Sequence, residues 1–539
     1  MSAGHYDLIV IGTGPGGAAL AQRLAPSGKS ILMIERGDYL PRSLANWDAK
    51  IVFSDLAYQA EETWYDKKGN PFHPGLHYFV GGNSKVYGAA LLRLRERDFD
   101  SVRHSDGLSP AWPLMYEDFE PYYAQAERVF HVHGQRGEDP TEPSSREPYP
   151  YLPVSHEPLI QNLHDSLTRI GLHPFHLPLG VLFDEKNGEA TPTSIWFRND
   201  VFDGFPCPLN GKADAQVMCI DPMLKSNVNV TLLTNACVTR LLTDPSGKKV
   251  DRVEVAVGEK HEQYSADIVV VACGALSSAL LLLRSANDHH PNGLANGSDQ
   301  VGRNYMRHNQ SVLMALTREL NKTVFQKTFA ISDFYFGSDD WDYPLGLIQT
   351  MGRSHAYQIS AEILPDWLSW FPEMPFDAMA RHSLDFWLMS EDLPRPENRI
   401  RIDHDGRVIL ELTENNMKAH HRLRSKLKQI MGEAYPHPAL LDRKIYFSKN
   451  IPIEGTAHQA GTARFGTDPA TSVLDVDCKA HELDNLYVVD GSFFPSIGAV
   501  NPTLTIIANA LRVADKIAAR MSAIPRFSEI ATEGASWTG

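Results

Sequence analysis

The residues whose types and spacing could bind a cofactor lie at the start of the chain. Within residues 7–35, Gly12, Gly14 and Gly17 follow an apolar run, and Glu35 ends the next apolar run, ILMIE. This order is typical of a dinucleotide-binding unit. The first glycine permits a tight turn, the second admits a pyrophosphate at a helix N-terminus, and the third lets helix and strand pack closely. Glu35 would accept a hydrogen bond from a ribose hydroxyl, but the pattern does not specify which dinucleotide binds.

A second group of residues with chemical potential lies near the other end of the chain. Residues 486–489 are expected to form a buried strand that ends at Asp490-Gly491, and Asn501-Pro502 precedes a long apolar helix. Proline suits the first helical position, so Asn501 is expected to be the helix N-cap. The N-terminus of a buried helix also offers free N–H groups and the positive end of a dipole, which would stabilise an electron-accepting ring. The two roles are compatible.

The elements between these two groups must bring them together. The segment 227–271 alternates short apolar runs with turns, and its last run leads into Gly274 and an apolar helix. This pattern predicts a set of β-strands that meets a second edge of the cofactor-binding domain. Gly81, Gly82 and Asn83 also follow apolar residues, and predict another place where the backbone could approach a cofactor.

Residues 306–451 have a different character, with many aromatic residues and a hairpin pattern whose turn is Asp405-Gly406. We interpret them as a separate, sheet-based substrate domain. The aromatic residues of 109–130 recur at helical spacing and predict a helix packed on the core. The segment 134–153 is rich in proline and charge, which predicts a surface segment that could serve as a lid.

Composition narrows the possible functions. The chain has 539 residues, 43% of them apolar, and a formal net charge of −15, so we expect two domains and neither nucleic acid nor an anionic membrane as a partner. No apolar run reaches about 18 residues, and the N-terminal residues lead directly into the first strand, which favours a cytoplasmic protein. The five cysteines have no CxxC spacing. The histidine pairs at 131/133, 289/290 and 420/421 are expected to be surface residues, and no metal site is predicted.

Four blocks of sequence together resemble the glucose–methanol–choline (GMC) oxidoreductase family of FAD enzymes. They are GTGPGG at 12–17 with Glu35, FVGGNSKVYGAALLR at 79–93, GALSSALLLLRSA at 274–286, and the region 458–501. The resemblance covers nearly the whole chain. It implies an α/β fold in which a Rossmann-like FAD-binding domain is interleaved with a sheet-based α+β substrate domain. The FAD-binding domain would comprise 1–105, 206–305 and 452–523, the substrate domain 106–205 and 306–451, and the tail 524–539.

The resemblance also implies roles for particular residues. His458, which precedes a Gly-Thr segment, matches the family's catalytic base, and Asn501 matches the second active-site position. This His/Asn pair resembles pyranose oxidases and bacterial sugar dehydrogenases. Asp490-Gly491 matches the flavin-side motif. The residues expected to bind FAD are Gly12, Gly14, Gly17, Glu35, Gly81, Gly82, Asn83, Ser84, Val238, Gly274, Asp490, Gly491, Pro502 and Thr503.

The chain departs from the family pattern after the glycines of the second block. Some relatives attach FAD covalently through a histidine there, whereas this chain has Val86 and Tyr87, so we expect non-covalent FAD. Glu391 lies on a strand that the family places near the flavin. A solvated carboxylate at a strand end is the other interpretation of this residue.

The first interpretation of function is FAD-dependent oxidation of an alcohol on a sugar, glycoside or polyol. Dioxygen or an external acceptor would then remove the electrons. A neutral imidazole is a suitable base for the hydroxyl proton, and an amide can orient the alcohol oxygen. Small or aromatic alcohols, an NAD(P)-dependent dehydrogenase and an inactive flavoprotein remain as alternatives. The oligomeric state does not follow from the sequence.

Overall fold

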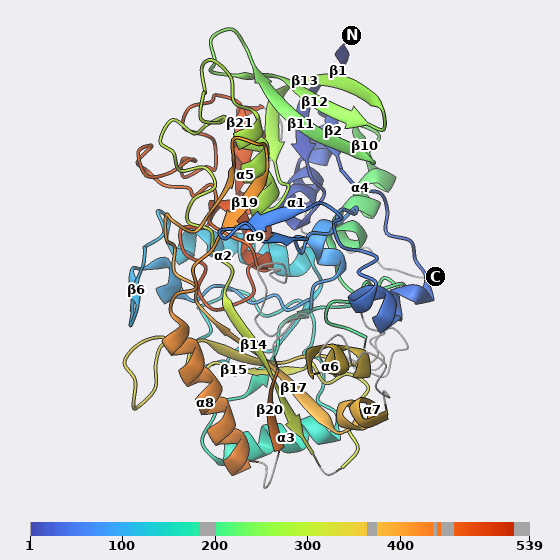
Figure 1. Ribbon diagram of the computed structural model, residues 1–539, viewed down its shortest axis with the longest axis vertical. Helices are drawn as coiled ribbons and strands as arrows, with labels where there is room; N and C mark the ends of the chain where they lie inside the picture. Colours follow the sequence, from blue (N-terminus) through green and yellow to red (C-terminus); the bar gives the residue numbers. More distant parts are fainter. Residues whose placement is uncertain are drawn as a thin grey trace.

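The computed structural model describes residues 2–182, 201–317, 319–363, 374–434, 439–443 and 458–521. These residues form two halves, each built on a large β-sheet (Figure 1). In Figure 1 a seven-stranded sheet occupies the upper half, and a six-stranded sheet occupies the lower half.

The seven-stranded sheet begins with the dinucleotide-binding unit predicted from the sequence. β1 (Ser2–Ile11) leads into α1 (Pro15–Leu24), which is followed by β2 (Ile31–Ile34), and β1 and β2 pair in parallel. Residues 8–11 and all of β2 are buried, as the continuous apolar runs of a covered parallel sheet require. The strand order is β10-β2-β1-β13-β12-β11, with β21 paired to β13. The remaining strands are β10 (Val230–Leu233), β11 (Ala236–Thr243), β12 (Val250–Val257), β13 (Lys260–Val271) and β21 (Leu486–Val488).

Strands β11, β12 and β13 form the expected antiparallel meander, but β10 pairs in parallel with β2 on the other side of the sheet. The C-terminal half of β13 pairs in parallel with both β1 and β21. It continues into α5 (Ala275–Arg284). The C-terminal ends of β1, β13 and β21 therefore lie at one edge, next to the N-termini of α1 and α5.

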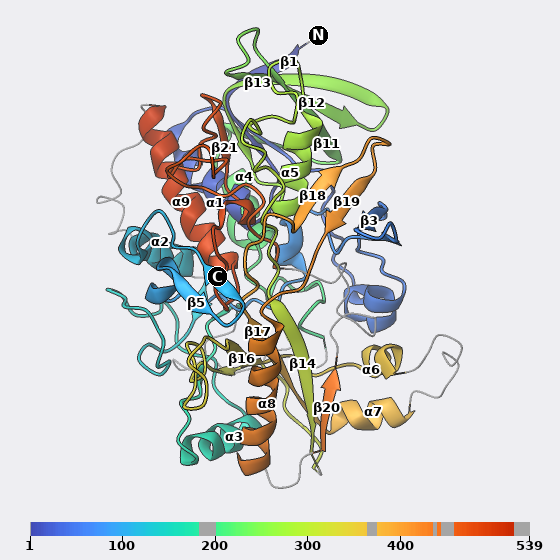
Figure 2. The same cartoon turned by 60° about the vertical axis from the view of Figure 1, so that its left-hand side comes forward.

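Helices pack against this sheet and against one another. α9 (Thr503–Arg520) contacts α1 and also α2 (Tyr116–Val129), and Figure 2 shows α9 and α1 side by side. The buried aromatic residues of α2, Tyr116, Phe119 and Tyr123, agree with the predicted core-facing helix. The short helix α4 (Asp221–Ser226) precedes β10. Small two-stranded sheets are formed by β5 (Val102–His104) with β6 (Gly107–Ser109) and by β7 (Val132–His133) with β9 (Leu179–Gly180).

The six-stranded sheet has the order β20-β14-β17-β16-β15-β8. Its strands are β8 (Phe175–His176), β14 (Asn309–Leu316), β15 (Phe329–Ile331), β16 (Leu347–Thr350), β17 (Ser383–Ser390) and β20 (Ala439–Arg443). α3 (Pro158–Arg169) and α8 (Met417–Ala434) cover the face that carries Leu313, Ile348 and Leu388. α6 (Ala356–Ile363) and α7 (Met374–Arg381) pack near Met314, whose side chain points to the other face.

The hairpin with the turn at Asp405-Gly406 forms as predicted, from β18 (Arg399–Ile402) and β19 (Val408–Glu411). Its place in the fold differs from the prediction. It does not join the six-stranded sheet. Instead, β19 pairs in parallel with β3 (Trp64–Asp66), which pairs with β4 (Pro71–Phe72). The hairpin thus lies beside the dinucleotide-binding half, where β18 contacts α5.

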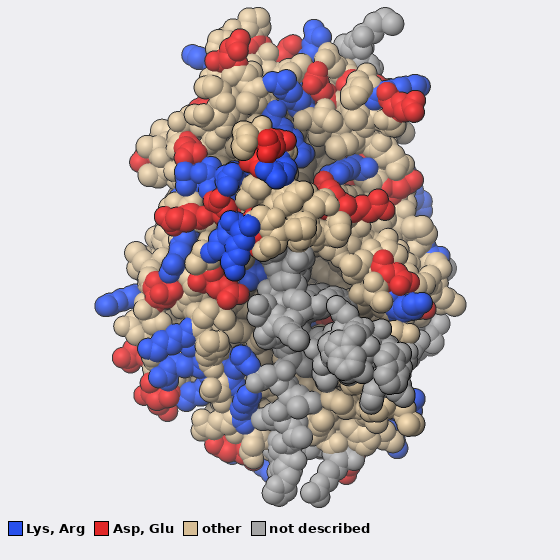
Figure 3. Space-filling view, in the orientation of Figure 1, with Lys and Arg blue, Asp and Glu red and all other residues tan. Residues whose placement is uncertain are grey.

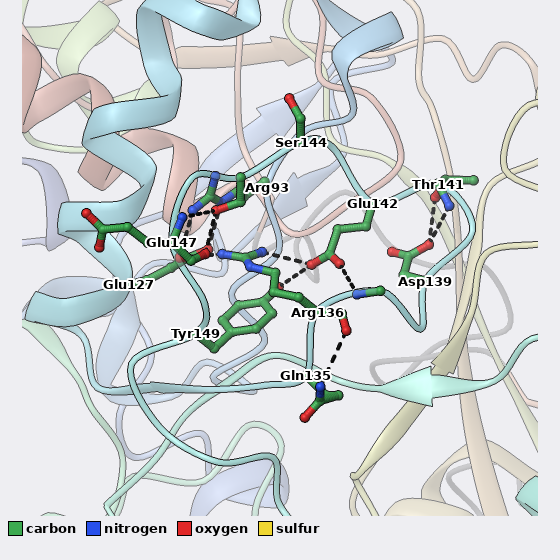
Figure 4. A network of polar contacts seen from close by, with 12 residues as sticks. Arg93, Glu127, Gln135, Arg136, Asp139, Thr141, Glu142, Ser144, Glu147 and Tyr149 are labelled. Atoms are coloured by element: carbon green, nitrogen blue, oxygen red, sulfur yellow. Dashed lines mark hydrogen bonds and ion pairs between the residues drawn. The ribbon is translucent and has the colours of Figure 1, made fainter.

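The proline- and charge-rich segment 134–153 is tied to α2 by a network of ion pairs (Figure 4). Glu127 of α2 accepts two hydrogen bonds from the Arg93 guanidinium, at 2.7 and 2.8 Å, and one from Arg136 at 2.7 Å. Arg136 also donates to Glu142 at 2.8 Å, and its guanidinium lies 3.6 Å from the centre of the Tyr149 ring. The segment is therefore held against the body of the protein.

Replacing Glu127 with glutamine is expected to lower the free energy of unfolding by about 3 kcal/mol, because the fully buried Arg93 charge loses its nearest carboxylate partner and keeps only that of Glu120, 3.7 Å away. Guanidinium denaturation followed by circular dichroism would measure this change. Glu147→Gln is the matched control: its ion pair with Arg128 is half-exposed, so the expected cost is about 0–1 kcal/mol. Equal costs for both variants would contradict a central role for the buried network.

Candidate active site

A cavity of about 670 Å³ lies between the two halves and is lined by residues from both. It extends from the turn after β1 and the end of β2 to the strands of the six-stranded sheet. This volume is within the usual range for cofactor and ligand sites. The segment 134–153 contributes no residue to its wall, so the lid function considered for that segment is not supported.

The glycine turn between β1 and α1 shapes one end of the cavity. Gly12 has a φ of +101°, and a Cβ atom there would lie 2.4 Å from the Ala272 carbonyl oxygen. A Cβ atom at Gly17 would lie 2.3 Å from the Gly12 carbonyl oxygen, so Gly17 allows α1 to pack on β1. At Gly14 no atom lies within 4 Å of such a Cβ, and the residue lines the cavity. A ligand can therefore approach the backbone closely at Gly14.

The N-termini of α1 and α9 both reach the cavity, through Gly14 and Thr503. Neither helix has an acidic residue in its first turn. The free N–H groups and the positive end of each helix dipole can therefore stabilise negative charge, as a pyrophosphate at one end and a reduced flavin at the other would require.

Glu35 lies at the end of β2 and is almost fully buried. Its Oε2 accepts hydrogen bonds from the Thr13 backbone N–H at 3.1 Å and from the Thr13 hydroxyl at 2.5 Å, and its Oε1 accepts from the Gly37 N–H at 3.0 Å. Burial raises the pKa of the Glu35 carboxyl, and these hydrogen bonds partly oppose that shift. Because Oε1 has a further lone pair and the residue lines the cavity, Glu35 can accept from a ribose hydroxyl.

The second glycine block lies directly against the first. The Gly81 N–H donates to the Thr13 hydroxyl at 3.1 Å, and a Cβ atom at Gly82 would lie 3.1 Å from Gly14 Cα. Thr13 therefore links Glu35 to the second block. This role of Thr13 was not predicted from the sequence, although its position between two fingerprint glycines is a usable signal.

Asp490 links the segment after β21 to the N-terminus of α5 at the C-terminal edge of the large sheet. Its Oδ2 accepts from the Gly274 N–H at 3.0 Å and from the Ser278 hydroxyl, and its Oδ1 accepts from the Ser492 N–H at 2.9 Å and the Ser492 hydroxyl. Burial raises the pKa of this carboxyl, and the hydrogen bonds counteract the shift. Asp490 thereby holds the N-terminus of α5 beside Gly491 at the cavity wall.

His458 and Asn501 meet at the other end of the cavity. Asn501 Nδ2 lies 3.4 Å from His458 Nε2, and both residues line the cavity. On its other side, His458 Nδ1 lies 3.1 Å from His308 Nδ1 and 2.8 Å from the Gln310 side-chain amide. Burial, together with the nearby His308 and Lys327, lowers the pKa of His458 well below 6.5. The imidazole is therefore neutral at pH 7 and can accept a proton.

The prediction that Asn501 caps the last helix is wrong. α9 begins at Thr503 with Pro502 at the N-cap position, and no side chain caps it. The Asn501 side chain instead lies against His458. The physical reason is that α9 begins one residue later than expected, so Asn501 precedes the N-cap position and the N–H groups of the first turn stay free for a ligand.

The six-stranded sheet contributes the remaining wall through side chains on one face. Gln349 and Trp387 are paired across β16 and β17 and line the cavity, whereas their neighbours Ile348 and Leu388 point toward α8. The ion pair of Lys327 with Asp203 also lines the cavity. These residues have no local motif in the sequence. Strand register brings Gln349 and Trp387 to the site, and the packing of the connecting segments brings Asp203 and Lys327 there.

Glu391 is not the solvated strand-end carboxylate considered as one interpretation. It is buried and does not line the cavity. His104 Nε2 lies 2.9 Å from one of its oxygens, and the other accepts from the Ser109 hydroxyl at 2.6 Å and from the Gly498 N–H at 3.1 Å. These interactions keep the pKa of Glu391 below its ordinary value although burial alone would raise it. Glu391 thus anchors the loop that carries Asn501.

The structure brings most of the predicted site residues to this one cavity. Those that line it are Gly12, Gly14, Glu35, Gly82, Asn83, Ser84, Val238, Gly274, His458, Asp490, Gly491, Asn501, Pro502 and Thr503. Gly17 and Gly81 lie behind the wall, where Gly17 permits helix packing and Gly81 donates to Thr13.

The prediction that the paired histidines lie at the surface is wrong for one member of each pair. His133, His290 and His420 are buried. Each accepts or donates a hydrogen bond within the fold, to the Leu152 carbonyl, the Gly247 carbonyl and the hydroxyls of Ser311 and Ser390, respectively. Within the described ranges, no group of three or more His, Cys, Asp or Glu side chains could hold a metal ion, and all five cysteine thiols are free.

A Rossmann-type unit that opens into a cavity with a neutral histidine at its far end is typical of dinucleotide-dependent oxidoreductases. Comparison with known proteins specifies the class. Models of the GMC oxidoreductase family match residues 76–310 and 394–510. The chain belongs to the GMC oxidoreductase family. It is an FAD-dependent oxidoreductase that acts on CH–OH groups.

Two relatives from Streptomyces are 30% identical to the chain. They are the 6'''-hydroxyparomomycin C oxidase of Streptomyces lividus, with 96% of this chain and 92% of the relative covered, and the paromamine 6'-oxidase of Streptomyces fradiae, with 95% and 91% covered. Among solved structures, an Aspergillus oryzae formate oxidase variant has a TM-score of 0.66 at 14% identity, covering 97% of this chain and 99% of that chain. These structural similarities establish the fold. No helix among the described residues is long and apolar enough to cross a membrane.

Proposed function

We propose that the protein oxidises a hydroxyl group of a sugar, glycoside or polyol to a carbonyl. The observation that carries this proposal is a pair of buried amide oxygens at the wall of the cavity. Asn501 Oδ1 and Gln349 Oε1 belong to residues that line the cavity, and neither oxygen has a hydrogen-bond partner within the described part of the chain. If the two amide side chains rotate to present these oxygens to the cavity, a substrate with several O–H or N–H donors would satisfy both, whereas a simple aromatic alcohol would leave at least one unpaired.

Asp203 is one of several acidic residues in the cavity wall, but its charge is balanced by Lys327, so the support for a substrate that also carries amino groups comes from the relatives. Asp203 pairs with Lys327, and both line the same cavity as His458. The names of the two Streptomyces relatives refer to aminoglycosides. An amino sugar or aminoglycoside is therefore the first substrate class to test.

In the proposed reaction, His458 Nε2 removes the proton of the substrate hydroxyl. The Asn501 amide, 3.4 Å from that nitrogen, orients the alcohol oxygen. Bound FAD supplies the acceptor for the hydride that leaves the same carbon, so that the loss of one proton and one hydride yields the carbonyl. Gly14, Glu35 and the N-terminus of α1 would hold the adenine half of FAD, and Asp490, Gly491 and the N-terminus of α9 the flavin half. Dioxygen or an external acceptor would then take the electrons.

Anaerobic mixing of the purified holoenzyme with a panel of alcohols tests this function. The panel should include paromamine, glucose, 2-methyl-1,2-propanediol, pyridoxine and benzyl alcohol, with flavin absorbance as the readout. We expect bleaching by a sugar or aminoglycoside. Bleaching only by the small or aromatic alcohols would reject the substrate class, and no bleaching by any alcohol would favour an inactive flavoprotein. Repeating the assay with oxygen and with artificial acceptors separates an oxidase from a dehydrogenase.

The rate of flavin reduction is expected to stay constant from about pH 8 down to about pH 6 and to fall only in more acidic solution. The sign follows from the site: a base acts in its unprotonated form, and the pKa of His458 lies well below 6.5, so protonation occurs only at low pH. Stopped-flow measurements across this range would test the profile. An acidic limb centred at or above the ordinary histidine pKa would contradict it.

FAD is expected to be released when the protein is denatured with acid. Val86 and Tyr87 occupy the positions after the second glycine block and line the cavity, and neither side chain can form a histidyl–flavin bond. The measurement is the absorbance of the supernatant after precipitation. Yellow colour that remains in the pellet would show covalent attachment.

A further inference from the structure

The buried side chain behind His458 is a second histidine, His308. We infer that His308 is a positioning residue that fixes which nitrogen of His458 carries the proton, so that His458 Nε2 is left with a lone pair toward the cavity. This inference rests on the proposed role of His458 as the base. It concerns a residue that no local motif marks, because 150 residues separate the two histidines.

Each ring nitrogen of His308 has a hydrogen-bonding neighbour. His308 Nε2 lies 3.0 Å from the Gly498 carbonyl oxygen, which can only accept, so Nε2 carries a hydrogen. Its Nδ1 lies 3.1 Å from His458 Nδ1. Two facing nitrogens can form a hydrogen bond only if one of them is protonated and the other is not. The direction of this bond therefore depends on the charge of His308.

The charge of His308 follows from its burial. His308 is 2% exposed, and burial lowers its pKa to about 4. The Glu391 carboxylate and the carbonyls of Ile497 and Gly498 act in the opposite direction but do not overcome burial. His308 is therefore neutral at pH 7, and with its hydrogen on Nε2 its Nδ1 is an acceptor. His458 must then donate through Nδ1, which leaves Nε2 unprotonated.

The side chain of Gln310 allows a second pattern of hydrogen bonds around His458 Nδ1. Its amide nitrogen lies 2.8 Å from His458 Nδ1, and donation from that nitrogen would require a bare Nδ1 on His458. His308 would then have to donate from both ring nitrogens, as a buried cation close to His458 and Lys327. The neutral alternative requires that Gln310 present its oxygen to His458, a rotation that exchanges two atoms of similar size and gives up the 3.5 Å contact of its amide nitrogen with the Arg307 carbonyl. The neutral arrangement avoids burying an additional positive charge.

Other contacts agree with a lone pair on His458 Nε2. The Asn501 amide nitrogen, a donor, is the group that lies 3.4 Å from it. The acceptor that orients His308 is also held in place, because the Gly498 N–H donates to Glu391 at 3.1 Å. His308 itself has a φ of +62°, in the left-handed region that residues other than glycine rarely adopt. The chain thus maintains an unfavourable backbone conformation at the residue that faces the base.

The test compares His308→Ala with His308→Asn in the FAD-loaded enzyme. Alanine removes the acceptor, whereas asparagine tolerates the positive φ and can present an oxygen near His458 Nδ1. We expect alanine to lower the rate constant of flavin reduction about 10- to 100-fold, with unchanged substrate dissociation constant and FAD content, and asparagine to restore much of it. His420→Asn is the control, a buried histidine on the opposite face of the six-stranded sheet, for which we expect no change in the rate.

A second readout does not depend on turnover. In protein labelled with ¹⁵N in the histidine rings, the His458 resonances, assigned by their loss in His458→Gln, should show a bare Nε2 in the native enzyme and a mixture of tautomers in His308→Ala. A bare Nδ1 in the native enzyme, or equal rates for the alanine variant and the native enzyme, would overturn the inference. The inference would also be overturned if both His308 variants lost the same fraction of the flavin-reduction rate and this loss matched a loss of bound FAD. If flavin is still reduced at a near-native rate in His458→Ala, the proposed role of His458 as the base fails. This result differs from those that would overturn the role of His308, so the two failures are distinguishable.

Discussion

Replacement of His458 with alanine is expected to lower the rate constant of flavin reduction by about 100-fold or more while FAD remains bound. The reason is that the substrate hydroxyl would have no base to accept its proton. Asn501 can only orient the alcohol oxygen, and His308 lies on the far side of His458, where its Nδ1 faces the His458 ring. A 100-fold effect corresponds to about 2.7 kcal/mol in the activation free energy.

Stopped-flow spectrophotometry with the best alcohol of the panel would measure this rate. His404→Ala is a suitable control, because its side chain is exposed and lies on the β18–β19 turn, outside the cavity wall. FAD content should be equal in both variants. Near-native reduction by His458→Ala would remove this residue from the role of base.

The second large effect concerns the cofactor. Gly14→Val is expected to weaken FAD binding by at least about 100-fold, or about 3 kcal/mol, with little change in the fold. No atom lies within 4 Å of a Cβ at this position, and the φ of −62° suits any residue, so the variant should fold. The added side chain would project into the cavity, at the N-terminus of α1 where the backbone should meet the pyrophosphate.

Titration of the apoprotein with FAD, followed by the quenching of flavin fluorescence, would give the dissociation constant. Gly432→Val is the matched control. Gly432 also has no atom within 4 Å of a Cβ, but it lies exposed on α8, far from the cavity wall. If the two variants bind FAD equally well, the cofactor does not pass over Gly14.

The acidic and basic side chains of the protein are interspersed on the face seen in Figure 3, and neither sign dominates a large area there. The net charge of −15 is therefore spread rather than gathered over this face. The visible part of this face therefore offers no large patch of one charge to a charged partner.

Several parts of the structure could be predicted from contiguous sequence. The unit 7–35, the core-facing helix within 109–130 and the hairpin around Asp405-Gly406 each follow from a local pattern of apolar spacing and turn residues, and each forms. Such patterns report which face of an element is buried. They do not report what covers that face. For this reason the hairpin was expected in the substrate domain, although β19 pairs with β3.

The sequence by itself therefore determined the dinucleotide-binding unit, the cofactor class through the family resemblance, and the pair His458 and Asn501. Only the tertiary structure decided how these residues are used. It buried Glu391 behind the loop of Asn501, brought Gln349 and Trp387 to the cavity through strand register, and set His308 behind His458. The physical reason is that these contacts join residues far apart in the chain. Their geometry depends on the packing of two sheets, which no local spacing encodes.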